Sequence, residues 1–352
     1  MPRISTVPAP RLATRLTICL ATLAPAAALA HPEVPDGFTI RRIAPLLDGA
    51  PPELHAIVDP GGFGAGVVSA TASGGIATFR LIEPGGTIRT LGVFADGALT
   101  DVVRVRLDTL GTLGGGLHAT ARFGPSTANQ TAYLTLRADG GIAERWRRGG
   151  STDNVTYDFE LTPGGTPDAA AVLLDQDVGS GTSLATMTTG FEVTVIDGDS
   201  LPIGRTDTDV RGFHRDVSGA YGGGILLADS DPNNDDITAI YELRVDGGLA
   251  SYRPIGGAVA TDQRFYGDLA IAEGGPLGGV IYITDQVTNE IQTVDAGGTH
   301  ATWATGFTNI DTLSISPDGQ SMYVADQSGV WLIRASGSEP GPVVLATDPS
   351  TP

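Results

Sequence analysis

The stretch Gly278–Phe307, GGVIYITDQVTNEIQTVDAGGTHATWATGF, contains one complete structural unit of this chain. An apolar strand ends at Asp285, a polar turn leads to a second strand that ends at Val294, and a Gly-rich turn leads to a third strand through Trp303. Three short strands joined by tight turns predict an antiparallel meander. The rest of the chain repeats this unit.

One strand core of this unit recurs six times along the chain. The six segments are Val67–Ala70, Leu117–Thr120, Val172–Asp175, Ile225–Ala228, Val280–Ile283 and Met322–Ala325. Their starts are 42 to 55 residues apart, a period typical of four-stranded propeller blades rather than of helical repeats. We therefore predict an all-β fold, a six-bladed β-propeller of four-stranded antiparallel blades, over residues 31–340.

The ends of the repeat region indicate how the ring closes. The sixth unit, Asp311–Arg334, lacks a fourth strand, whereas Gly37–Ile43 reads as a strand with no blade of its own. Pairing these two segments would remove two exposed edges. The alternative closing strand is Pro342–Ala346, but we expect closure by the N-terminal strand and a loose C-terminal tail over residues 341–352.

Residues 1–30 have the features of a secretory signal peptide. Three arginines precede the short apolar run Leu16–Ala28, and Ala28-Leu29-Ala30 forms a small-residue cleavage site before His31. We expect this segment to be removed, so that the chain is exported to the periplasm or secreted and the mature chain has no transmembrane span. Cys19, the single cysteine, lies inside it.

The chain is strongly acidic. It has no lysine, and 21 arginines stand against 40 acidic residues, which gives a formal net charge of −19. Such a charge repels nucleic acid and anionic lipid and favours cations or basic partners. Solubility alone would also explain it.

Each unit has an acidic residue at the start of its innermost strand. The set is Glu53, Asp101, Asp153, Asp209, Asp268 and Asp311. Innermost strands line the central channel of a propeller, so we expect these carboxylates to ring one channel mouth and to bind a cation or a basic ligand. A second set, Asp175, Asp229, Asp285 and Asp326, ends the second strands. The alternative for both sets is that they cap turns by accepting backbone N–H bonds.

The fourth unit has an acidic loop, Asp229–Asp236, with oxygen-bearing side chains at alternate positions: Asp229, Asp231, Asn233 and Asp235. Such spacing suits a hard cation, so this loop is a candidate calcium site. The sixth position is Asn234 rather than Gly, and the twelfth is Ile240 rather than Glu. A solvated acidic loop is the alternative.

No nucleophile motif or zinc-type histidine pair is found, so no catalytic residue is assigned. His55 and His214 lie on innermost strands and are expected to face the channel.

The run Asn309–Asp326, NIDTLSISPDGQSMYVAD, resembles the regucalcin and gluconolactonase-like propellers and, more loosely, NHL-type repeats. In the lactonase family an Asn in this run binds the catalytic divalent metal, and Asn309 is the matching position. Glu53 matches that family's N-terminal metal-binding Glu. The glycine that follows the Asn in the family is Ile310 here, and no counterpart of the segment with the catalytic Asp is found. The resemblance therefore implies the propeller fold, and it implies metal chemistry through two positions only.

These observations predict an exported binding or interaction module that holds a structural divalent cation such as calcium. The alternative is a metal-dependent, lactonase-like hydrolase at the acidic channel mouth. The sequence leaves open whether the chain is an enzyme, and whether its partner is a small molecule, a cation or a basic protein.

Overall fold

A computed structural model describes residues 31–49, 51–57, 62–109, 111–124, 130–148, 155–162, 170–177, 181–197, 209–230, 237–246, 249–260 and 266–337. The predicted signal peptide, the loop 231–236 and the tail from residue 338 lie outside these residues. No helix occurs within the described ranges. Accordingly, no helix there is long and apolar enough to cross a membrane.

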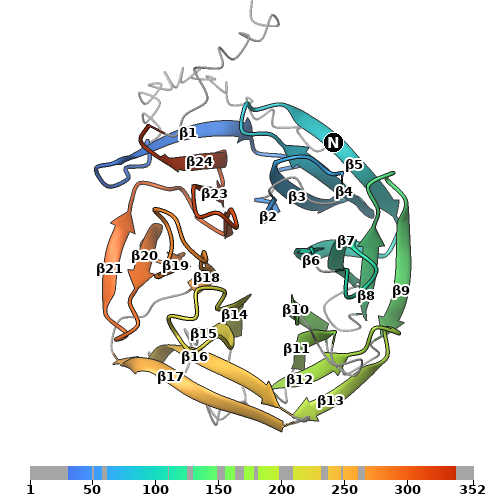
Figure 1. Cartoon of the computed structure of the whole chain (residues 1–352). Coiled ribbons are helices and arrows are strands. Elements are labelled where there is room, and N and C mark those ends of the chain that lie inside the picture. The colour runs from blue at the N-terminus through green and yellow to red at the C-terminus, as the bar shows by residue number, and fades with distance from the viewer. Residues whose placement is uncertain are drawn as a thin grey trace, which may run out of the picture. The chain divides into compact units, whose positions relative to one another are not determined.

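The described strands form six antiparallel sheets of four strands each, arranged as the blades of a ring (Figure 1). The chain is therefore a six-bladed β-propeller, as the repeat predicts. Blades one to three contain β2 (Glu53–Ile57), β3 (Gly66–Ser73), β4 (Ile76–Ile82) and β5 (Ile88–Ala95); β6 (Leu99–Asp108), β7 (Gly116–Phe123), β8 (Gln130–Leu136) and β9 (Ile142–Arg148); and β10 (Val155–Leu161), β11 (Ala171–Asp177), β12 (Gly181–Met187) and β13 (Val193–Asp197). Blades four to six contain β14 (Asp209–Arg215), β15 (Ile225–Ser230), β16 (Ile237–Asp246) and β17 (Leu249–Ala260); β18 (Tyr266–Ala270), β19 (Ile281–Asp285), β20 (Glu290–Val294) and β21 (His300–Ala304); and β22 (Leu313–Ile315), β23 (Ser321–Asp326), β24 (Gly329–Ala335) and β1 (Phe38–Pro45).

The N-terminal strand closes the ring. β1 pairs antiparallel with β24, from Phe38 opposite Ala335 to Pro45 opposite Gly329, and so supplies the outer strand of the sixth blade. In Figure 1 this pairing joins the blue and red ends of the described chain. The prediction of N-terminal closure is confirmed.

The hydrophobic core is divided among the contacts between blades. Within the described ranges, six clusters of buried apolar side chains each join two neighbouring blades. The cluster around Phe79 and Phe123, for example, joins the first and second blades. Burial between faces of adjacent sheets stabilises the ring as a whole, because each blade provides half of two clusters.

β-bulges interrupt four of the six innermost strands close to the channel. The register shifts between Val102 and Arg104 in β6, Thr156 and Asp158 in β10, Arg211 and Phe213 in β14, and Tyr266 and Leu269 in β18. A bulge adds one residue and reverses which side chains face the channel. Channel residues of these strands therefore cannot be found by counting from the strand start.

Candidate functional site

Each innermost strand carries a fully buried apolar residue that packs between blades and has a channel position on either side. The six apolar residues, exposed by 2% or less, are Leu54, Val105, Phe159, Phe213, Leu269 and Leu313. Because successive side chains of a strand point to opposite faces, the flanking positions form two sets along the channel. The Arg104 layer comprises Glu53, Arg104, Asp158, Gly212, Asp268 and Thr312, and the Arg106 layer comprises His55, Arg106, Glu160, His214, Ala270 and Ser314.

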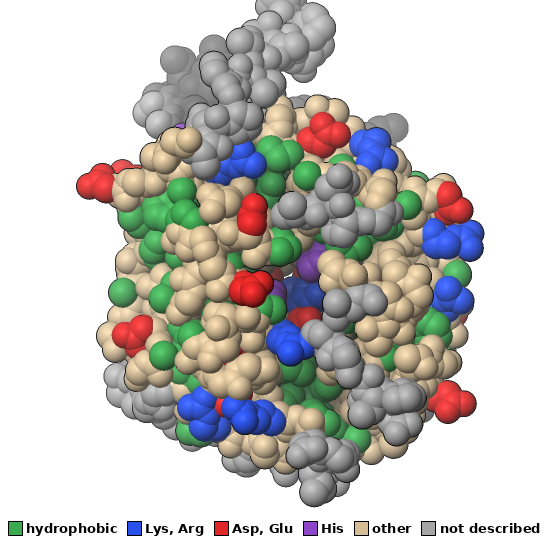
Figure 2. Space-filling view, viewed as in Figure 1, with side chains coloured by type: hydrophobic (Ala, Val, Ile, Leu, Met, Phe, Trp, Pro, Cys, Tyr) green, Lys and Arg blue, Asp and Glu red, His purple; other side chains and the backbone are tan. Residues whose placement is uncertain are grey.

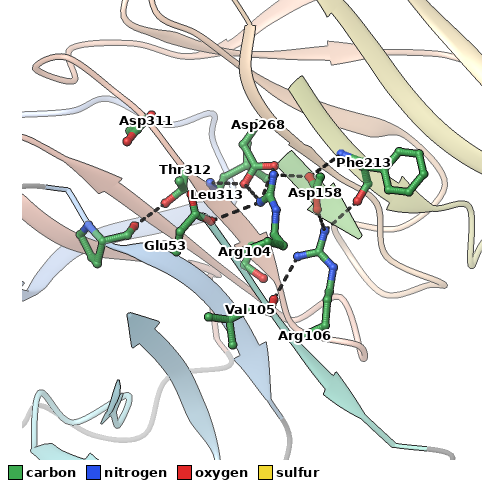
Figure 3. Close-up of polar contacts among 12 residues, drawn as sticks. Glu53, Arg104, Val105, Arg106, Asp158, Phe213, Asp268, Asp311, Thr312 and Leu313 are labelled. Atoms are coloured by element: carbon green, nitrogen blue, oxygen red, sulfur yellow. Dashed lines mark hydrogen bonds and ion pairs between the residues drawn. The ribbon is translucent and has the colours of Figure 1, made fainter. Parts of the chain in front are cut away.

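The guanidinium of Arg104 joins three blades at the channel axis (Figure 3). Its Nη2 lies 2.6 Å from Asp158 Oδ2, and its Nη1 lies 3.1 Å from Asp268 Oδ1. Glu53 Oε2 lies 3.4 Å from the same Nη1. One buried cation thus faces carboxylates from the first, third and fifth blades.

Backbone donors hold two of these carboxylates in place. Asp158 accepts the N–H of Phe159 at 2.7 Å and that of Phe213 at 3.2 Å. Asp268 accepts the N–H of Leu269 at 2.9 Å and that of Leu313 at 3.3 Å. Burial raises the pKa of Asp158, although the nearby charge of Arg104 lowers it in part. Burial also opposes the charge of Arg104, but the surrounding carboxylates outweigh it and raise its pKa well above the usual value.

Gly212 explains why the fourth blade adds no side chain to the Arg104 layer. Its φ is +64°, and a Cβ at this position would lie 2.6 Å from the backbone nitrogen of Leu269. Only glycine fits such a close approach without strain.

The carboxyl of Glu53 is the least satisfied member of the cluster. Its Oε2 is buried and accepts no hydrogen bond from the residues that the structure describes. Burial raises the pKa of Glu53 well above its usual value, and Asp268, Asp311 and Asp158 raise it further, whereas Arg104 lowers it. Glu53 therefore holds a proton at higher pH than an ordinary glutamate.

The Arg106 layer combines a second arginine with two histidines. Arg106 Nε donates to Glu160 Oε2 at 3.2 Å, and its Nη2 donates to the Phe213 carbonyl at 2.7 Å. His55 Nε2 accepts the N–H of Leu107 at 3.0 Å. Both histidines line one cavity, as expected from their innermost strands.

The acidic cavity, of about 340 Å³, lies where β6 begins. Its walls include Asp48, Glu53, Asp101, Arg122, Asp311 and Thr312. The histidine cavity, of about 170 Å³, lies where β6 ends, and its walls include His55, Arg106, Asp108, Glu160, His214 and Arg215. Figure 2 shows a hollow at the centre of the ring with histidine (purple), arginine (blue) and acidic (red) side chains at its walls.

The predicted carboxylate ring is brought together only in part. Glu53 and Asp268 enter the Arg104 layer, while Asp101 and Asp311 line the acidic cavity. Asp153 lies outside the described residues, as does the side chain of Asp209 at the start of β14.

The described members of the second acidic set act as turn caps. Asp285 accepts the N–H of Val287 at 3.0 Å, and Asp326 accepts those of Thr308, at 3.0 Å, and Ser328, at 2.8 Å. The side chains of Asp175 and Asp229 lie outside the description, as do Asp231, Asn233 and Asp235 of the candidate calcium loop.

The sequence analysis did not predict three residues at the centre of the site: Arg104, Arg106 and Asp158. The available signal is the alternation V-V-R-V-R-L over residues 102–107, which places two arginines on one side of an apolar strand. A charged residue repeated at period two in a buried strand indicates a paired charge at the channel.

The Glu53 site does not fit a divalent metal as it stands. A guanidinium 3.4 Å from Glu53 would repel a cation bound there. Asn309 is exposed, with φ +48°, in the segment before β22. Within the described ranges, no group of three or more His, Cys, Asp or Glu side chains is arranged to hold a metal ion.

The fold and the channel cluster define a six-bladed propeller with a charged, arginine-bridged axis. No protein-family profile matches the sequence, and no curated protein is significantly similar to it. Among solved structures, a propeller described as a candidate gluconolactonase is 14% identical, with 86% of this chain and 94% of that chain covered and a TM-score of 0.53. The Pan2 WD40 domain of Neurospora crassa is 9% identical, with 87% and 98% covered and a TM-score of 0.48. A gluconolactonase of Xanthomonas campestris is 11% identical, with 83% and 96% covered and a TM-score of 0.48. At these identities the likeness shows the fold: this chain resembles the gluconolactonase-like propellers in its architecture.

Proposed function

We propose that the chain is an exported binding module and that the acidic cavity is its ligand site. The observation that carries this proposal is Glu53 Oε2, a buried acceptor in the cavity wall that receives no hydrogen bond from the described residues. An unsatisfied buried acceptor is costly, and a donor on a ligand would remove that cost. Export rests on the N-terminal sequence, residues 1–30.

The chemistry of the cavity indicates the ligand class. Asp101 and Asp311 add negative charge beside Glu53, and Thr312 adds a hydroxyl. The volume of about 340 Å³ suits a small molecule. Arg104, which also lines the cavity 3.4 Å from Glu53, disfavours a cation at Glu53 itself. The site therefore favours a small ligand that places a hydroxyl donor at Glu53 and an ammonium group at Asp101 and Asp311.

Titration of the mature chain with putrescine, a small diamine, tests this proposal. We expect saturable binding by calorimetry and an increase in melting temperature. The double variant Asp101→Asn with Asp311→Asn should weaken binding about tenfold or more.

The matched control is Asp139→Asn, because the side chain of Asp139 is 68% exposed and lies in a surface turn. Absence of saturable binding, or equal loss in the control and the double variant, would contradict the proposal.

A lactonase-like hydrolase is the second candidate. It is favoured by the fold shared with the candidate gluconolactonase and by the raised pKa of Glu53, which suits proton transfer at a cavity wall. Hydrolysis of glucono-δ-lactone, lost on chelation and in Asn309→Ala, would support it. A chain that binds putrescine and shows no turnover is a binding module.

Calcium binding by the loop Asp229–Asp236 is a separate proposal, supported by the alternation of oxygen-bearing side chains. Calcium should raise the melting temperature of the wild type but not of Asp231→Ala. An unchanged wild-type melting curve would indicate a solvated acidic loop.

A further inference from the structure

We infer that the histidine cavity is a second ligand site, at the other end of β6 from the acidic cavity, and that it binds a small oxyanion. The ligand chemistry is that of sulfate, phosphate or a carboxylate group. This inference is independent of the acidic cavity, since the two cavities have different walls.

Arg215 is available to a ligand in this cavity, whereas Arg106 and the acidic groups are already engaged. Arg215 is half-buried, and within the described ranges no carboxylate lies within ion-pair distance of it. Glu160 is bound to Arg106 at 3.2 Å. Asp108 accepts the N–H groups of Leu113, at 2.7 Å, and Gly115, at 3.0 Å. Its carboxylate therefore stabilises the loop that follows β6.

The histidine hydrogen bonds define which ring nitrogens face a ligand. His55 Nε2 accepts a backbone N–H, so in its neutral form the proton lies on Nδ1. His214 Nδ1 donates to the carbonyl of Arg215 at 2.9 Å, so Nε2 is the nitrogen left for a ligand. The cavity thus offers a guanidinium and two imidazoles to an anion.

Basic side chains lie around His55 although the whole chain is acidic. Burial lowers the pKa of His55 well below its usual value, and the positive charges of Arg106, His214 and Arg104 lower it further. Distant surface carboxylates are screened over about 10 Å at ordinary salt, so groups in the cavity wall dominate its potential.

Titration with sulfate, followed by calorimetry and histidine NMR signals, tests the inference. We expect saturable binding with shifts at His55 and His214, and a loss of affinity of about tenfold or more in Arg215→Gln. Arg215→Lys should retain part of the affinity.

The matched control is Arg137→Gln, which removes the same charge from a side chain that is 71% exposed. It should bind sulfate as the wild type does, and Arg215→Gln should bind putrescine unchanged and melt as a folded protein. Titration with malonate in the same series shows whether the site also takes carboxylates. Failure of both anions to saturate the wild type, or equal sulfate affinity in Arg215→Gln, would overturn the inference.

Discussion

Arg104 connects the first, third and fifth blades through a single guanidinium at the channel axis. A buried arginine with several carboxylates offsets their mutual repulsion, since its fork of donors can reach more than one acceptor. Such a cluster adds less net stability than its contacts suggest, because every member loses hydration. Its removal, however, leaves Asp268 without its arginine and Asp158 with Arg106 alone, at 3.7 Å.

Replacement of Arg104 by methionine should therefore destabilise the protein by about 3–5 kcal/mol, because Asp158 and Asp268 would remain buried and charged. Chemical denaturation measures the change. The exposed Arg137→Met is the control. A loss below about 1 kcal/mol would show that the carboxylates are compensated by other groups.

Glu53 should make the protein more stable as the pH falls from neutral toward 4.5, its usual pKa. The folded state binds the proton more tightly than the unfolded state, so acidification in this window favours folding. Unfolding free energies of the wild type and Glu53→Gln, measured across the window, isolate this effect. We expect the wild type to gain stability relative to the variant; parallel curves would mean that Glu53 titrates normally.

Among the strands, β1 covers the outer edge of β24 in the sixth blade. Without it, β24 would expose the backbone groups that now pair from Phe38 opposite Ala335 to Pro45 opposite Gly329. β1 also brings Ile43 and Ala44 into the apolar cluster between the sixth and first blades.

Deletion of residues 35–45 should lower stability by more than the ~1 kcal/mol typical of a point mutation, since it removes both the pairing and this packing. Thermal melting of the mature chain with and without the segment measures the effect. Deletion of residues 341–352 serves as the comparison. A larger loss from the tail deletion than from the loss of β1 would contradict the role of β1.

The elements also show what sequence could predict. The recurring strand cores and turns predict six blades and the closing strand, because spacing and turn chemistry are local properties. Arg104, Arg106 and Asp158 were missed, because bulges in β6 and β10 shift the register after the strand start. Glu53 and Asp268, which the sequence assigns to the channel mouth, both lie beside Arg104, the first on a strand without a bulge and the second on a bulged one. The cation was predicted from acidic residues alone, without the positive charge that Arg104 places beside Glu53.

For the whole molecule, charge is distributed unevenly. The formal net charge is −19, yet the axis combines Arg104 and Arg106 with their carboxylates, and the two cavities differ in character. Surface charges repel one another through solvent, whereas the buried pairs are shielded from dissolved ions.

Raising the sodium chloride concentration should therefore raise the melting temperature by a few degrees, because it screens surface repulsion more than it weakens the axial cluster. Scanning calorimetry over a salt series measures this. A melting temperature that falls with salt would show that screened attractive pairs dominate the stability.

The pairing of β1 with β24 also sets the order of events during protein synthesis. Phe38 is made almost 300 residues before its partner Ala335, so the ring cannot close while the ribosome is still adding the first five blades. Contacts between such distant residues form slowly. A chain still lacking residues 329–335 has no partner for its first strand, so ring closure follows the synthesis of β24. Until then the chain exposes two unpaired strand edges, which are prone to aggregation.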